Sequence, residues 1–188
     1  MPLGVQFESV LLAAKSGAEW AIALLYRDLD PKLLRFLRAQ EPVEGDDLAS
    51  EVWLDAAAGL GRFVGDEQAF QRWIFTIARR RLIDLRRRRG RRPELVGLRE
   101  SLVDRDGAHD PESVVLAGSE TEAALARIGR LSRDQAEVVL LRVVGGFDVK
   151  EVATIIGKTP GAVRVLQHRA LQRLAQELTQ EKRRSVTR

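Results

Sequence analysis

Residues 147–174 carry the signals of two short helices joined by a tight turn, and this stretch restricts the possible folds more than any other. Asp148 and Glu151 stand three residues apart, as in a capping box that opens a helix. Gly157 supplies the permissive backbone that a tight turn between helices needs. Thr159 then has N-cap chemistry for a second helix whose first residue is proline. The pattern predicts a helix-turn-helix.

The second helix of this motif has an apolar stripe and a polar outer face. The stripe comprises Val163, Leu166, Ala170 and Leu174, and the outer face comprises Arg164, Gln167, His168, Gln172 and Arg173. In a helix-turn-helix the second helix enters the major groove, where Arg and Gln side chains read base edges. An ordinary helical hairpin with a solvated polar face is the alternative. The two caps and the spacing together favour DNA binding.

Composition narrows the class of protein. The 188 residues allow one ordinary domain or two small ones, and 31% charged with 45% hydrophobic residues is typical of a globular protein. The absence of cysteine excludes disulfides, thiolate catalysis and Cys-based zinc sites, and two distant histidines offer little for a metal site. No apolar run approaches the ~20 residues of a membrane helix, and the N-terminus lacks a signal pattern. We therefore expect a cytoplasmic protein without membrane insertion.

The net charge of +4 hides a strong segregation of charge. Between Arg79 and Arg92 there are nine arginines and one acid, whereas between Pro93 and Ala124 there are eight acids and two arginines. Such blocks predict a surface that binds a polyanion, followed by an acidic connector. A merely solvated or disordered basic face is the alternative. The basic run continues a periodic apolar helix, which favours a positioned patch.

The N-terminal part predicts four helices. The second spans about residues 20–38, and Pro31 inside it predicts a break or kink near Asp30. The third follows the turn at residues 42–45, and the fourth begins near Asp66. Apolar residues recur at helical spacing in each of these segments.

The sequence as a whole predicts an all-α protein of two small helical domains, residues 1–92 and 119–181. A flexible acidic linker is expected over 93–118, because this stretch is rich in Pro and Gly and too polar to build a core. In the second domain, Ser132 with the Gln three residues later predicts another capping box. Residues 182–188 are expected to form a frayed basic tail.

Three segments, residues 45–63, 69–89 and 131–174, resemble in their order and spacing the bacterial extracytoplasmic-function (ECF) sigma factors. The similarity covers most of the chain. It implies a promoter-melting domain and a −35-reading domain that bind core RNA polymerase and promoter DNA. It also implies control by an anti-sigma factor.

The resemblance further implies three groups of contact residues. The helix from residue 47 matches the segment that docks on the coiled coil of the polymerase's largest subunits. The loop over residues 62–70 matches the loop that captures a base flipped from the −10 element, and the following arginines would hold phosphates. The polymerase-binding set is Asp47, Leu48, Ser50, Glu51, Leu54 and Asp55; the −10 set is Arg62, Phe63, Asp66, Phe70, Arg79, Arg80, Arg86 and Arg87; the −35 set is Lys158, Thr159, Arg164, Gln167, His168 and Arg169.

The residues themselves leave alternatives open within these groups. The acids from residue 47 to 55 could simply solvate a core helix, and Trp53 could belong to the core or to an interface. Phe63 and Phe70 could be core aromatics rather than base contacts. His168 could touch phosphate or solvent rather than a base.

Two positions depart from the family pattern. Arg80 stands where many members have Asn, so the −10 preference of other members does not carry over. Val165 stands where a small polar residue, often Ser, is common. This valine implies either an apolar contact, such as one to a thymine methyl, or a packing change.

A stand-alone helix-turn-helix transcriptional regulator is the main alternative function. Its C-terminal half would look much the same, but a sensor domain has no reason to carry a tryptophan-containing helix that ends in arginines. An enzyme would need clustered acids for metals or a nucleophile with its base. The acids of this chain lie on helix faces or in the linker. We therefore predict no catalytic residue, no metal, no cofactor and no small-molecule substrate.

Overall fold

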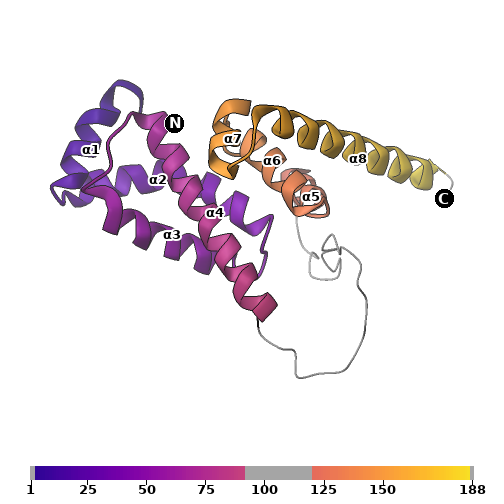
Figure 1. Cartoon of the computed structure of the whole chain (residues 1–188), viewed down its shortest axis with the longest axis horizontal. Coiled ribbons are helices and arrows are strands. Elements are labelled where there is room, and N and C mark those ends of the chain that lie inside the picture. Colours follow the sequence, from indigo (N-terminus) through magenta and orange to yellow (C-terminus); the bar gives the residue numbers. More distant parts are fainter. Residues whose placement is uncertain (1–2, 92–119, 187–188) are drawn as a thin grey trace. The chain divides into compact units, whose positions relative to one another are not determined.

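The computed structural model describes residues 3–91 and 120–186, with side chains over 3–90 and 123–180, and in these ranges the regular elements are helices. The chain divides into two compact units, Met1–Val96 and Gly97–Arg188. The all-α prediction is confirmed (Figure 1). The linker predicted over 93–118 lies outside the described residues. The elements are η1 (Gly4–Gln6), α1 (Phe7–Lys15), α2 (Glu19–Arg38), α3 (Gly45–Leu60), α4 (Glu67–Arg91), α5 (Glu120–Gly129), α6 (Arg133–Val143), α7 (Val149–Ile156) and α8 (Pro160–Val186).

The N-terminal unit is a four-helix domain in which α2 contacts α1, α3 and α4. Its centre is an aromatic pair, Phe36 of α2 and Phe75 of α4, whose ring centroids lie 5.2 Å apart in an edge-on arrangement. Both side chains are fully buried, together with Leu33 and Val52. Edge-to-face packing adds to the stability that burial of the rings provides. This core fixes α3 and α4, the two helices that carry the predicted contact residues.

Of the break or kink predicted near Asp30, the break does not occur: α2 runs without interruption from Glu19 to Arg38. Pro31 is exposed, so the hydrogen bond that proline removes is lost on the solvent side of the helix. Leu29 and Leu33 on the opposite side are buried. Packing on that side keeps the helix continuous across the proline.

The helix-turn-helix of the C-terminal unit is built as the sequence predicts. The carboxylate of Asp148 accepts from the Glu151 N–H at 2.8 Å, and the Glu151 carboxylate accepts from the Asp148 N–H at 2.9 Å. Gly157 adopts the left-handed conformation, with φ of +66°, which L side chains rarely adopt. Thr159 caps α8 by accepting from the Ala162 N–H at 3.2 Å. The capping box, the turn and the N-cap are thus confirmed.

Two predictions about helix ends, the capping box at Ser132 and the frayed tail, are wrong. Ser132 is the N-cap of α6, but its side chain makes no capping bond; a backbone bond from the Ala136 N–H to the Ser132 carbonyl (2.8 Å) begins the helix instead. The tail predicted to fray from residue 182 is helical as far as Val186. Its first three residues, Lys182, Arg183 and Arg184, are strong helix formers. Among the described helices, none is long and apolar enough to cross a membrane.

Candidate nucleic-acid and polymerase interfaces

α8 presents a polar face outside a buried apolar stripe. Val163 and Ala170 are fully buried where α8 packs on α6 and α7. Arg164, His168 and Arg169 are exposed. Gln167 is half-buried. The structure therefore brings the members of the predicted −35 set on this helix together on its accessible side.

Val165 also lies on the accessible side of α8. Its side chain is 50% exposed, so it does not fill a gap in the core. Of the two interpretations left open by the sequence, the structure favours an apolar surface contact over a packing change. A thymine methyl in the major groove is the group that an exposed valine could touch.

Lys158 and Thr159, the remaining members of the −35 set, lie at the start of α8. The Lys158 ammonium is 2.9 Å from the Asp134 carboxylate of α6, and Thr159 serves as the N-cap. Surface ion pairs contribute about 0–1 kcal/mol, so Lys158 can exchange this partner for a phosphate. Helix N-termini and adjacent hydroxyls are common phosphate contacts.

The loop over residues 62–66 rests on a cluster of aromatic rings. The Phe63 ring stacks on Trp73 at 5.1 Å and meets the edge of Phe70 at 5.4 Å. Phe70 is 3% exposed, so its expected contact with a base is corrected: the ring supports the loop from beneath. Phe63 is half-buried, and Arg62 is exposed. Asp66 accepts from the Ala69 N–H at 2.7 Å and thereby caps α4.

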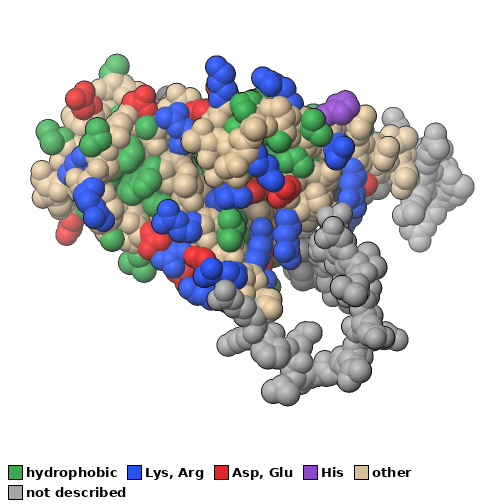
Figure 2. All heavy atoms as spheres, in the orientation of Figure 1, with side chains coloured by type: hydrophobic (Ala, Val, Ile, Leu, Met, Phe, Trp, Pro, Cys, Tyr) green, Lys and Arg blue, Asp and Glu red, His purple; other side chains and the backbone are tan. Residues whose placement is uncertain are grey.

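The arginines of α4 divide into accessible and internally paired side chains. Arg80, Arg87 and Arg88 are exposed, and among the described residues Arg87 makes a long contact of 3.7 Å with Asp84 on the same helix. Arg79 is half-buried. Figure 2 shows basic and acidic side chains interleaved where α4 reaches its C-terminal end. These exposed arginines are accessible to a polyanion.

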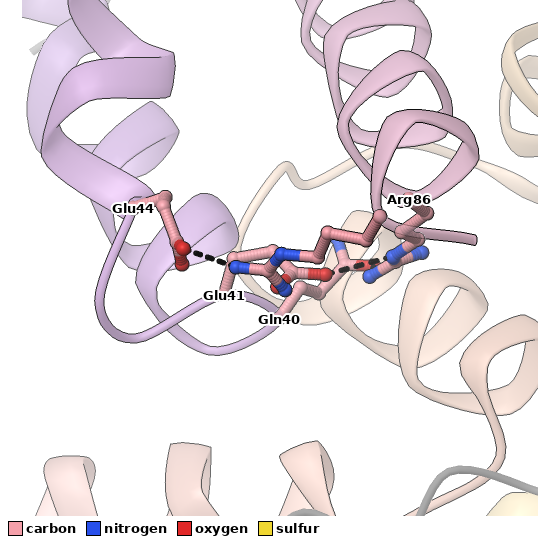
Figure 3. Close-up of polar contacts among 5 residues, drawn as sticks. Gln40, Glu41, Glu44 and Arg86 are labelled. Atoms are coloured by element: carbon pink, nitrogen blue, oxygen red, sulfur yellow. Dashed lines mark hydrogen bonds and ion pairs between the residues drawn. The ribbon is translucent and has the colours of Figure 1, made fainter. Parts of the chain in front are cut away.

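Arg86 does not belong with the accessible arginines, and its expected −10 contact is corrected. Its Nε atom donates to the Glu41 carboxylate at 2.8 Å, and a terminal nitrogen donates to the Gln40 side chain at 3.3 Å (Figure 3). Arg89 donates to the other Glu41 oxygen at 2.8 Å and also pairs with Glu44. The Glu41 side chain is only 6% exposed. These two arginines tie the end of α4 to the segment between α2 and α3.

The predicted polymerase-binding set on α3 contains both exposed and buried residues. Asp47, Ser50 and Leu54 are exposed, and the Leu54 side chain is 71% exposed. Leu48 is 4% exposed, so its expected place in the docking surface is corrected: it lies in the stripe that packs on the core. The exposed members, polar residues around one large apolar side chain, have the character of a protein-binding patch.

Glu51 and Asp55 pair with Arg81 of α4. The guanidinium donates to both Asp55 oxygens, through Nε at 2.7 Å, and to Glu51 at 3.0 Å. Bidentate pairs of this kind are among the stronger surface contacts. Both carboxylates therefore join α3 to α4 in addition to any contact with a partner.

We predict that this pairing makes the N-terminal unit sensitive to acid. Hydrogen bonding to Arg81 lowers the pKa of Asp55. A carboxyl group with a lowered pKa in the folded state contributes stability above its unfolded pKa, about 3.9, and this contribution is lost as the pH falls through the folded pKa. Arg81→Gln should flatten the loss of stability below about pH 4. Urea titrations at a series of pH values measure the free energy of unfolding. Unfolding is monitored by the fluorescence of the three tryptophans, which all lie in this unit.

Arg88→Gln is the matched control, since it removes an exposed arginine from the same helix. It should leave the acid limb of the curve unchanged. An Arg81→Gln curve that runs parallel to the parent curve down to the acid transition would contradict the role of the pair.

Trp53 is an anchor between helices rather than a free interface residue. Its indole N–H donates to the Asp30 carboxylate at 2.9 Å, and its ring lies 5.0 Å from Tyr26. Asp30 is 8% exposed. A buried carboxylate needs such a donor, so this contact fixes α3 against α2.

The sequence did not reveal which residue pairs with Arg86 and Arg89. Glu41 stands 45 residues before Arg86 and 48 before Arg89, and no helical spacing links them. The only signal was an excess of acids in the segment before α3. Lys15 and Glu67, which contact the loop and its surroundings, were missed for the same reason.

Comparison with known proteins agrees with this geometry. The model of Sigma-70 region 2 matches residues 25–92, and that of Sigma-70, region 4 matches residues 121–174. The ECF RNA polymerase sigma factor SigD of Mycobacterium tuberculosis is 31% identical over 182 residues, covering 93% of this chain and 85% of the relative. The ECF RNA polymerase sigma factor ShbA of Streptomyces griseus is 33% identical over 170 residues, covering 86% and 89%.

Two solved structures share the fold. CnrH in complex with the cytosolic domain of CnrY has a TM-score of 0.64 and 21% identity, covering 92% of this chain and 97% of that chain. RpoE in complex with the anti-sigma factor NepR from Bartonella quintana has a TM-score of 0.61 and 22% identity, covering 82% and 94%. The matches to both regions and the identity to relatives over most of their length establish that the chain belongs to the ECF family of RNA polymerase sigma factors.

Proposed function

We propose that this protein is an initiation factor that binds core RNA polymerase in the cytoplasm and directs it to promoters with −10 and −35 elements. It carries out no catalysis of its own. One observation carries the proposal: the chain combines two different surfaces suited to DNA. The first is the exposed face of the recognition helix, α8. The second is the arginine-bearing helix α4 with the adjoining loop, which rests on aromatic rings. A stand-alone regulator needs only the first of these.

The two domains have different roles in this proposal. Residues 1–92 bind polymerase through α3 and open the −10 element. The polymerase contacts are Asp47, Ser50, Glu51, Leu54 and Asp55. Residues 119–181 read the −35 element through the second helix of the helix-turn-helix. The linker over 93–118 joins them. The −10 contacts are Arg62, Phe63, Asp66, Arg79, Arg80 and Arg87, and the −35 contacts are Lys158, Thr159, Arg164, Gln167, His168 and Arg169.

An anti-sigma factor is the expected regulator. Both solved relatives named above are complexes, and one of these partners is described as an anti-sigma factor. An exposed Leu54 and two separate DNA-binding surfaces would otherwise be available to unintended partners. We propose that a partner of this class covers the polymerase-binding and DNA-binding surfaces until a signal releases it.

We predict that Arg87 and Arg88 set the salt dependence of promoter binding. Replacing both with Gln should weaken holoenzyme binding to all promoters alike and reduce the slope of log K against log salt. The expected reduction is roughly 0.7–0.9 for each phosphate that is no longer neutralised. Binding titrations at several salt concentrations measure this slope. Arg86→Gln is the matched control. Because Arg86 is paired with Glu41, this variant should leave the slope unchanged.

Transcription from a promoter library tests the proposed function. The protein is mixed with core polymerase and templates whose −10 and −35 regions are randomised, and the run-off transcripts are sequenced. We expect transcripts only when both the protein and the core enzyme are present, with base preferences at two separated elements. Sequence-specific binding of a single operator by the protein alone, with no transcripts in the mixture, would favour the stand-alone regulator.

A further inference from the structure

Leu3 and Gly4 are hydrogen-bonded to Glu67, the residue that follows the loop over residues 62–66. The backbone N–H groups of Leu3 and Gly4 donate to the two carboxylate oxygens of Glu67, at 2.8 and 2.9 Å. Glu67 is the first residue of α4 and follows the loop directly. One carboxylate thus holds two consecutive amides that lie 64 and 63 residues before it in the chain.

A second contact holds the middle of the loop. Lys15, the last residue of α1, donates through Nζ to the Phe63 carbonyl at 2.5 Å. Beneath it, Phe7 of α1 lies 5.7 Å from the Phe70 ring on which Phe63 rests. Hydrogen bonds with an ionised partner are roughly twice as strong as neutral ones. The segment from Leu3 to Lys15 therefore holds the loop at two separate points.

The loop itself fits closely against α4. A Cβ atom at Gly65 would lie 2.7 Å from the Ala69 Cβ and 3.1 Å from the Phe63 ring, so only glycine allows this approach. A side chain larger than hydrogen at residue 65 would therefore disturb the packing of the loop on α4.

An open hollow of about 850 Å³ lies between the N-terminal segment and the loop. Gly4, Val5 and Glu8 line one side, and Val64, Gly65, Asp66, Gln68 and Gln71 line the other. An extruded base is held by apolar contacts and by hydrogen bonds to its edge. The exposed Val5 and Val64 and the carboxamides offer both.

We propose that the segment Leu3–Lys15 is a positioning element for the loop and forms one wall of its base-binding site. Glu67 and Lys15 are the positioning residues. This inference rests on the proposed function, which assigns the loop to an unpaired base of the −10 element. Discrimination among bases then depends on residues that precede the region 2 match, which begins at residue 25.

Two variants release the loop at different points. Lys15→Met removes the ammonium but keeps the length of the side chain, and Glu67→Ala removes both acceptor oxygens. Lys15→Arg is the conservative variant that keeps a charged donor. Lys32→Met, on α2, is the matched control for loss of a lysine.

The first readout is hydrogen exchange of the amides at residues 62–66 in the free full-length protein. Lys15→Met should speed this exchange roughly tenfold, the factor that corresponds to the loss of one charge-assisted hydrogen bond. Glu67→Ala removes two such bonds and should speed the exchange at least as much. Lys15→Arg and Lys32→Met should exchange like the parent protein. The second readout is base preference on a −10 library with core polymerase. Preference at a single non-template position should fall roughly tenfold, with the −35 preference and the affinity for core enzyme unchanged.

The two readouts separate the ways in which the proposal can fail. Unchanged exchange in both variants would overturn the positioning role, whatever the library gives. Faster exchange with unaltered base preferences would overturn the assignment of the segment as a wall of the base site. A parent protein that shows no polymerase-dependent base preference would contradict the proposed function and, with it, the base-binding part of this inference.

Discussion

Replacing Glu41 with alanine should destabilise the N-terminal unit by about 3 kcal/mol, the lower end of the range for breaking a buried ion pair. The Glu41 side chain is 6% exposed and accepts from both Arg86 and Arg89. Its removal leaves the Arg86 guanidinium, itself only 18% exposed, without its main counter-charge. The value stays at the lower end because Arg89 is half exposed and can turn toward solvent. Urea unfolding followed by tryptophan fluorescence measures the loss.

Glu44→Ala is the matched control. Glu44 pairs with Arg89 from the same segment, but its side chain is 33% exposed, so its removal should cost under about 1 kcal/mol. Glu41→Gln should fall between the two, because it keeps one acceptor oxygen but no charge. Equal, small losses for Glu41→Ala and Glu44→Ala would contradict the structural role of the buried carboxylate.

Arg164→Ala and Gln167→Ala should each lower selectivity at one −35 position by about 1–3 kcal/mol. Both side chains lie on the accessible side of α8, above the buried Val163. Arg and Gln make two hydrogen bonds to guanine and adenine, respectively, in the major groove. Holoenzyme competition between a promoter and its single-base variants measures the effect position by position.

Arg173→Ala is the control for loss of charge on the same helix. Arg173 is exposed and lies two and a half turns beyond Arg164, so it can reach phosphates but is farther from the N-terminal end of the helix that enters the groove. It should weaken binding to promoter and random DNA alike. If Arg164→Ala and Gln167→Ala also gave equal losses on both kinds of DNA, they would be phosphate contacts only.

The local signals in the sequence predicted most of the helical architecture. The capping box at Asp148, the left-handed Gly157 and the cap at Thr159 all depend on neighbours within a few residues, and each was confirmed. Pro31 does not break α2, because a local rule for proline does not consider which side of the helix faces solvent. Burial of Leu29 and Leu33 outweighed the lost hydrogen bond.

The contact residues were harder to predict, because exposure depends on partners far away in the chain. Arg86 and Arg87 are neighbours in one arginine run, yet Arg86 is held by Glu41 while Arg87 remains exposed. Leu48 and Leu54 lie on one helix, yet the first is buried and the second is exposed. A six-residue spacing on a helix separates their faces, but only the packing of α3 shows which face is covered.

The most direct test of sigma-factor function compares promoter binding with and without core polymerase. Fluorescence of a −10 base analogue on the non-template strand reports both binding and strand opening. We predict that the protein alone leaves the signal near its duplex level, and that adding core enzyme raises it on promoter DNA but not on a scrambled duplex. Strand opening by core enzyme without the protein, or tight specific binding by the protein with no response to core enzyme, would contradict this function.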